Sequence, residues 1–87
     1  MKNGKRVTTI SFRSGEGAST LIGYINRSNQ KCHGTLGVKG TDHMQYAYRL
    51  ECLGCGYVYG ANGSDIAERR CPECDGGAAG IRYWRSD

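Results

Sequence analysis

Cys52-Leu53-Gly54-Cys55 and Cys71-Pro72-Glu73-Cys74 decide how this chain folds. Each stretch is a Cys-x-x-Cys pair, and fifteen residues separate the two pairs. Four soft ligands in two such pairs have the spacing of a tetrahedral metal site. Glycines close behind each pair, such as Gly56 and Gly76, allow backbone N–H groups to turn back toward the sulfur atoms. The sequence therefore predicts one metal ion held by Cys52, Cys55, Cys71 and Cys74.

The length and composition of the chain explain why a metal is needed. Its 87 residues include 14 glycines and one proline. A domain of this size buries little apolar surface, and glycine increases the entropy lost on folding. Small folds often add a metal as a staple. We expect a single compact unit with two parts, a basic strand–helix element over residues 1–45 and a four-cysteine ribbon over residues 46–87.

The cysteine count also bears on the cellular compartment. Five cysteines are an odd number for a disulfide framework, and four of them have ligand spacing. Residues 1–6 are basic, but residues 7–12 alternate like a strand and do not form the apolar core of a secretory signal. No stretch approaches membrane-spanning length. We expect a cytoplasmic protein, because paired cysteines in a reducing compartment more often bind metal than form disulfides.

The charge of the chain is distributed unevenly. Residues 1–50 hold eight Lys or Arg against two acidic residues, whereas residues 51–87 hold four against six. Four thiolates on one divalent ion make the second part still more negative. An anionic partner such as nucleic acid should therefore contact the N-terminal part. The expected phosphate contacts are Lys2, Lys5, Arg6, Arg13, Arg27 and Lys31.

The N-terminal part has the pattern of a short strand–helix–strand element. Residues 7–12 alternate in polarity as a half-buried strand does. Apolar residues over 18–25 recur with helical spacing, which predicts a helix. Glycines punctuate residues 32–40, which predicts a short hairpin or a bulged strand.

The ribbon part is predicted to be two knuckles on antiparallel hairpins. Residues 45–52 form the clearest strand, and residues 57–59 lead out of the first knuckle, so a hairpin with the metal at its tip is expected. A turn over 61–64 and one helical turn over 65–68, capped by its first residue, precede the second knuckle. A last strand is expected over 81–84. The fold class is a small α+β domain stapled by metal.

The ribbon part resembles the zinc-ribbon and rubredoxin-like group over roughly residues 46–84. The resemblance rests on the two cysteine pairs and on the run Cys55-Gly56-Tyr57-Val58-Tyr59. It implies four cysteine ligands and two facing knuckles over a small antiparallel sheet, with either structural zinc or electron-transferring iron. The chain departs from rubredoxins at Asp75 and at Gly60-Ala61, and its connector is shorter. Structural zinc is therefore favoured over iron.

Other uses of the cysteines and histidines are disfavoured. A redox Cys-x-x-Cys normally precedes a helix in a βαβ unit, and neither pair has that context. Four protein thiolates leave a zinc ion no open position for catalysis. Cys32, His33 and His43 form at most an incomplete second site, and a small buried cysteine with surface histidines is the simpler interpretation.

Aromatic residues alternate with arginines through the ribbon part. Exposed rings beside guanidinium groups can stack nucleic-acid bases, although most rings of so small a ribbon must form its core. Trp84 is the ring most expected at the surface, because Arg82 and Arg85 flank it.

The functional hypothesis is a non-enzymatic zinc-ribbon module that contacts nucleic acid, DNA or RNA, within a larger assembly. No membrane and no small-molecule substrate is expected. Two alternatives remain open: a protein–protein adaptor with a purely structural zinc, and a rubredoxin-like electron carrier with iron.

Overall fold

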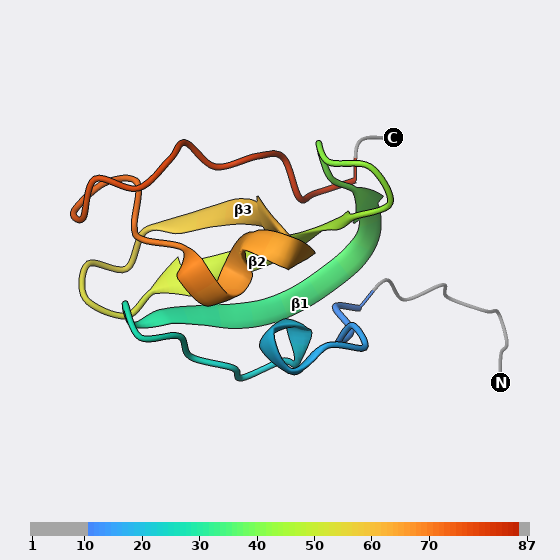
Figure 1. Ribbon diagram of the computed structural model, residues 1–87, viewed down its shortest axis with the longest axis horizontal. Helices are drawn as coiled ribbons and strands as arrows, with labels where there is room; N and C mark the ends of the chain where they lie inside the picture. The colour runs from blue at the N-terminus through green and yellow to red at the C-terminus, as the bar shows by residue number, and fades with distance from the viewer. Residues whose placement is uncertain (1–10, 86–87) are drawn as a thin grey trace, which may run out of the picture.

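A three-stranded antiparallel sheet forms the centre of the protein. The computed structural model describes residues 11–85. The strands are β1 (Gln30–Lys39), β2 (Tyr46–Cys52) and β3 (Val58–Asn62), and they lie side by side in that order (Figure 1). Because β1 pairs with β2, the sheet joins residues from both parts that the sequence distinguishes.

β1 is the bulged strand that its glycines predicted. Its register with β2 shifts on either side of Thr35, and the two glycines in these irregular stretches, Gly34 and Gly37, have φ angles of +94° and +84°. A side chain at Gly34 would approach the carbonyl oxygen of Arg13 to 2.7 Å. Arg13 and Thr35 exchange two backbone hydrogen bonds of 2.9 Å there. The bulge therefore lets the N-terminal segment lie against β1.

Two short 3-10 helices complete the regular structure of residues 11–85. They are η1 (Ala18–Thr20) and η2 (Gly63–Glu68), and η2 lies across the sheet in Figure 1. Ile66 of η2 is fully buried against Leu50 of the central strand and Tyr59 of β3. The main apolar core therefore lies between the sheet and η2. Within the described residues, no helix has the length and apolarity to span a membrane.

The predicted helix over residues 18–25 is wrong beyond one 3-10 turn. The chain leaves the helical region at Leu21, and Gly23 has a φ of +97°. The N–H of Gly23 donates to the carbonyl of Cys32, and the N–H of Cys32 donates to the carbonyl of Tyr24, both at 2.8 Å. Pairing with β1 therefore replaces helical hydrogen bonds. The apolar spacing does not mark a core-facing stripe, since Leu21 is 48% exposed.

Three smaller predictions about the chain's turns and ends also change. Residues 61–64 are not a turn, because β3 continues through Asn62 and η2 begins directly after it. Asn62 occupies the N-cap of η2 without a side-chain cap, so the predicted capping by Asp65 is wrong. Only Ile81 of the predicted last strand pairs with the sheet, in a single bridge to Gly60. The predicted strand over 7–12 falls largely outside the described residues, and Ser11 and Phe12 are not in a strand.

Candidate metal centre

The two Cys-x-x-Cys pairs meet at one end of the β2–β3 hairpin. Cys52 ends β2, and Cys55 lies in the turn that leads to β3. Cys71 and Cys74 lie in the loop that follows η2. The four sulfur atoms lie within 4.8 Å of one another. The structure therefore forms the four-cysteine cluster that the sequence predicts.

The spacing of the sulfur atoms suits a tetrahedral ion. The Sγ atoms of Cys52 and Cys74 are 3.7 Å apart, and those of Cys55 and Cys71 are 3.6 Å apart. A tetrahedron with zinc–sulfur bonds of about 2.3 Å has edges of about 3.8 Å. The two measured edges join one cysteine of each pair, so the two knuckles already face each other at bonding distance for a single ion.

Backbone hydrogen bonds shape both knuckles, and in the second knuckle they reach a sulfur atom. In the second knuckle, the N–H groups of Glu73 and Cys74 donate to the Sγ of Cys71 at 3.3 and 3.4 Å. In the first knuckle, the N–H of Gly56, at a φ of +83°, donates to the carbonyl of Cys52 at 2.7 Å and closes the turn. Such donors orient thiolate ligands and stabilise their negative charge.

A close approach of backbone to backbone fixes the second knuckle. The N–H of Gly77 donates to the carbonyl oxygen of Cys71 at 3.0 Å. A Cβ atom at Gly77 would clash with the carbonyl oxygen of Arg70. Only glycine therefore permits this return of the chain over the knuckle.

The electrostatics of the four thiols favour the binding of a cation. A hydrogen bond from the side-chain amide of Gln30 is the main cause that lowers the pKa of the Cys52 thiol to about 6. Hydrogen bonds with Cys55 and Cys71 are the main cause that raises the pKa of Cys74. The cluster thus accepts one thiolate readily and opposes a second, mainly because a protonated thiol hydrogen-bonds to its neighbouring sulfur atoms. A divalent ion removes that opposition and allows all four to ionise. The donor set therefore fits a metal ion.

Gln30 is a functional residue that the sequence analysis missed. It begins β1 opposite Cys52 and is 1% exposed. The hydroxyl of Tyr59 donates to its Oε1 at 2.7 Å, and its Nε2 donates to the carbonyl of Ser28 at 2.8 Å. Its side chain thus connects the core tyrosine to the first metal ligand. No motif marks it, and the only signal is a glutamine at the start of an otherwise buried strand.

The second site suggested by Cys32, His33 and His43 does not form. Within the described residues, the four-cysteine cluster is the one group of His, Cys, Asp and Glu with metal-ligand geometry. Cys32 is fully buried in the core, where burial raises the pKa of its thiol. The Nε2 of His33 lies 2.8 Å from a carboxylate oxygen of Glu51 on the neighbouring strand. His43 is exposed in the loop between β1 and β2.

Three of the six residues expected to contact phosphate lie within the described part of the chain, and their surroundings differ. Lys2, Lys5 and Arg6 lie outside the described residues. Arg13 is exposed, and its guanidinium lies 5.6 Å from the ring centroid of Tyr46. Arg27 pairs with the carboxylate of Glu68 at the surface, and Lys31 is half-buried on β1. Of the described members, Arg13 is thus the one that is both exposed and free of an acidic partner.

Comparison with protein families, curated proteins and solved structures finds no match for this chain. The cysteine cluster and its geometry are therefore the ground for any functional assignment.

Proposed function

We propose that this protein is a non-enzymatic module that contacts nucleic acid within a larger assembly. A structural zinc ion would hold the fold of this module together. The observation that carries the proposal is the set of four sulfur atoms within 4.8 Å of one another, with two edges of 3.6 and 3.7 Å that join the two knuckles. Zinc takes four thiolates without demanding any other geometry, and a site filled by four protein ligands is structural. Cys52, Cys55, Cys71 and Cys74 would hold the ion, which supplies folding energy and no chemistry.

The identity of the metal has a direct test. Metal analysis of the purified protein by mass spectrometry is expected to find one zinc ion per chain, and the protein is expected to be colourless. Iron on four thiolates absorbs visible light and changes oxidation state. A red protein with one equivalent of iron would refute structural zinc and support the electron-transfer alternative.

Charge supports the nucleic-acid part of the proposal. Residues 1–50 carry eight basic residues against two acidic ones, and the metal part is acidic. A polyanion would therefore approach from the N-terminal part. Within the described residues, Arg13 presents an exposed cation on the segment that lies against β1.

Binding of labelled oligonucleotides at several salt concentrations tests this part. Fluorescence anisotropy is expected to show affinity that falls linearly in a log–log plot against salt, with a slope of about −0.7 to −0.9 per phosphate contact. Neutralising Lys2, Lys5, Arg6 and Arg13 together with glutamine should reduce the slope. Arg27→Gln alone should change it less than Arg13→Gln, because Glu68 already pairs with Arg27. Absence of binding even at low salt would refute the nucleic-acid proposal.

An adaptor role is a second candidate, and exposed apolar side chains favour it. Leu21, Ile22 and Ile25 are 48%, 50% and 48% exposed, and they follow one another on the segment beside β1. Exposed apolar side chains are typical of protein-docking surfaces where they form a contiguous patch. Association with a protein partner that resists high salt and is lost in Ile22→Asp would support this role. Association weakened by salt and unaffected by that substitution would count against it.

A further inference from the structure

A groove lined by aromatic rings lies between β3 and the C-terminal segment. It has a volume of 320 Å³. Four of the residues that line it are aromatic: Tyr57, Tyr59, Tyr83 and Trp84. We call this space the aromatic groove. The four-cysteine cluster does not line it, and neither do Arg13, Arg27 and Lys31.

Two glycines bring the C-terminal segment against β3 and so form the groove. The N–H of Ile81 donates to the carbonyl of Gly60 at 2.9 Å. A Cβ atom at Gly60 would clash with the carbonyl oxygen of Ile81, and one at Gly80 would lie 2.7 Å from the Cβ of Tyr59. The segment therefore pairs with the strand through one backbone bridge, and the two aromatic residues that follow, Tyr83 and Trp84, line the groove.

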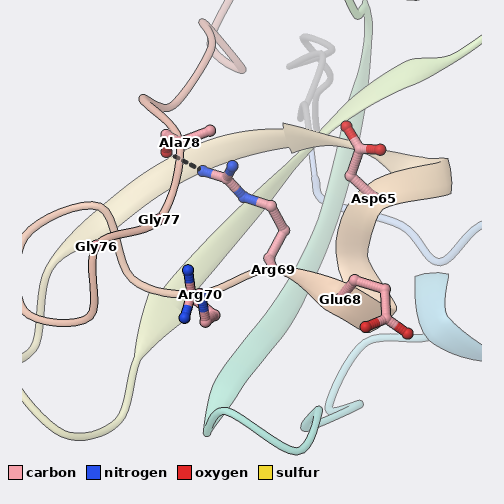
Figure 2. Close-up of a pocket in the computed structure, with 7 residues that line it drawn as sticks. All are labelled: Asp65, Glu68, Arg69, Arg70, Gly76, Gly77 and Ala78. Atoms are coloured by element: carbon pink, nitrogen blue, oxygen red, sulfur yellow. Dashed lines mark hydrogen bonds between the residues drawn. The ribbon is translucent and has the colours of Figure 1, made fainter.

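Arg69, which directly follows η2, contacts the C-terminal segment that forms one side of the aromatic groove. Figure 2 shows its side chain reaching toward Ala78, whose carbonyl oxygen accepts a hydrogen bond of 2.7 Å from the Nη2 of Arg69. The same guanidinium lies over the ring of Tyr59, 4.9 Å from its centroid. Arg69 does not line the aromatic groove, but its contacts with Ala78 and Tyr59 hold the two sides of the groove in place. The pocket in Figure 2 is no anion site itself, because Asp65 and Glu68 line it together with the arginines.

The rings of the aromatic groove come in supported pairs. Tyr57 is 38% exposed and stacks on the buried Tyr59, with centroids 5.8 Å apart and an interplanar angle of 18°. Trp84 is 53% exposed and meets Tyr83 edge-on at 5.3 Å. Each exposed ring therefore rests on a less exposed one, which reduces the side-chain entropy lost when a flat ligand binds.

The charge of the aromatic groove indicates what it binds. The guanidinium of Arg82 lies 6.0 Å from the ring centroid of Trp84, and Arg85 is exposed next to that ring in the chain. No acidic residue within the described part of the chain lines the groove. Flat π-faces beside guanidinium groups match a base with its phosphate. A proline-rich peptide also fits aromatic grooves, but it has no phosphate for the arginines to contact.

We propose that the aromatic groove stacks the bases of single-stranded nucleic acid on Tyr57 and Trp84, with Arg82 and Arg85 at the phosphates. This inference rests on the nucleic-acid function proposed above and names a site and a ligand form for it. Stacking needs unpaired bases, so single strands bind here and duplexes do not.

The single tryptophan of the chain makes the test direct. The metal-loaded full-length protein is titrated with a labelled oligothymidylate, a matched duplex and an oligonucleotide of abasic sites. Anisotropy of the label measures binding anywhere, and fluorescence of Trp84 measures stacking in the groove. Only the strand with unpaired bases is expected to quench Trp84. Trp84→Ala should weaken its binding about tenfold to a hundredfold, the loss of one base–aromatic stack.

Two control variants show whether a change in binding is due to the aromatic ring at position 84. Trp84→Phe retains a stacking face and should restore most of the affinity that Trp84→Ala loses. Met44→Ala removes a side chain that is 86% exposed and lies outside the groove, and it should change neither signal.

Each remaining outcome overturns a defined part of the inference. Anisotropy without quenching, and with unchanged affinity in Trp84→Ala, removes the stacking site and leaves the nucleic-acid function intact. Absence of anisotropy at low salt removes both. If a proline-rich peptide quenches Trp84 while no oligonucleotide does, the groove is a peptide site and the inference is wrong.

Discussion

Asn26 is expected to carry an unusually large share of the stability of this small fold. It is 5% exposed. Its Oδ1 accepts hydrogen bonds from the N–H groups of Ser28 and Gln30, at 2.8 and 3.0 Å. Its Nδ2 donates to the carbonyls of Ile66 and Arg69, at 2.8 and 2.9 Å. One side chain therefore ties the start of β1 to the end of η2.

The size of the effect follows from what Asn26→Ala leaves behind. Four backbone groups lose a hydrogen bond, and the bonds to Gln30 and Ile66 are buried, although the Ile66 carbonyl still accepts the N–H of Arg69 at 3.3 Å. A buried group left unpaired costs about 1–3 kcal/mol, and a partly exposed one costs less because water replaces the partner. The expected loss in the free energy of unfolding is about 4 kcal/mol. That loss is a large fraction of the roughly 5–15 kcal/mol that stabilises a typical domain.

Urea unfolding of the metal-loaded protein measures the loss, with Trp84 fluorescence and circular dichroism as independent probes. Asn26→Asp should be nearly as destabilising, because it keeps the acceptor and points a carboxylate at two carbonyls. Asn29→Gly is the matched control: Asn29 is exposed at a φ of +60°, which glycine adopts freely, so stability should change by less than about 0.5 kcal/mol. A loss below about 1 kcal/mol in Asn26→Ala would refute the reasoning.

Three further predictions concern the metal and the core. Cys71→Ser should abolish stoichiometric metal binding while Cys32→Ala retains it, and metal analysis that finds full occupancy in Cys71→Ser contradicts the ligand assignment. Burial, the main cause, raises the pKa of Tyr59 from 10.0 to about 12. The unfolded chain therefore loses this proton first, so stability present below pH 10 declines between pH 10 and 12. Urea midpoints should fall less over that window in Tyr59→Phe, and an equal fall counts against the assignment. Gly77→Ala should reduce metal affinity in chelator competition, because its Cβ clashes with backbone, whereas Gly54→Ala, whose Cβ meets only one sulfur atom at 3.7 Å, should not.

The sequence predicts the metal cluster well, because ligand spacing is a local property. Two residues between paired cysteines allow both sulfur atoms of a pair to reach one ion, and this spacing can be read from adjacent residues. The alternation over residues 45–52 likewise predicts β2, because side chains with a period of two point alternately to the two faces of a half-buried strand. The glycines over residues 32–40 indicate a short hairpin or a bulged strand, and the structure has the bulged strand, with Gly34 and Gly37 in its irregular stretches.

Prediction fails where distant residues decide the local structure. The stretch from Leu21 to Ile25 has helical spacing, but hydrogen bonds to β1 outweigh a helix propensity that is weak in so short a segment. The roles of Asn26 and Gln30 depend on partners on η2 and β3, about 30 to 40 residues away. Nothing in their own neighbourhood distinguishes them from surface amides.

Because Cys32 is buried, the number of reactive thiols indicates whether the protein is metal-loaded, metal-free or unfolded. With an ion on the cluster, the four ligand sulfurs are bonded and react slowly with a thiol reagent, and the fifth thiol lies at 0% exposure and is shielded. A chelator releases the four ligand thiols together, and Cys32 stays protected only as long as the core remains closed. Denaturation then adds the fifth. Oxidation after metal loss accordingly pairs ligand cysteines with one another first, and a mispaired bond to Cys32 records that the chain has been unfolded.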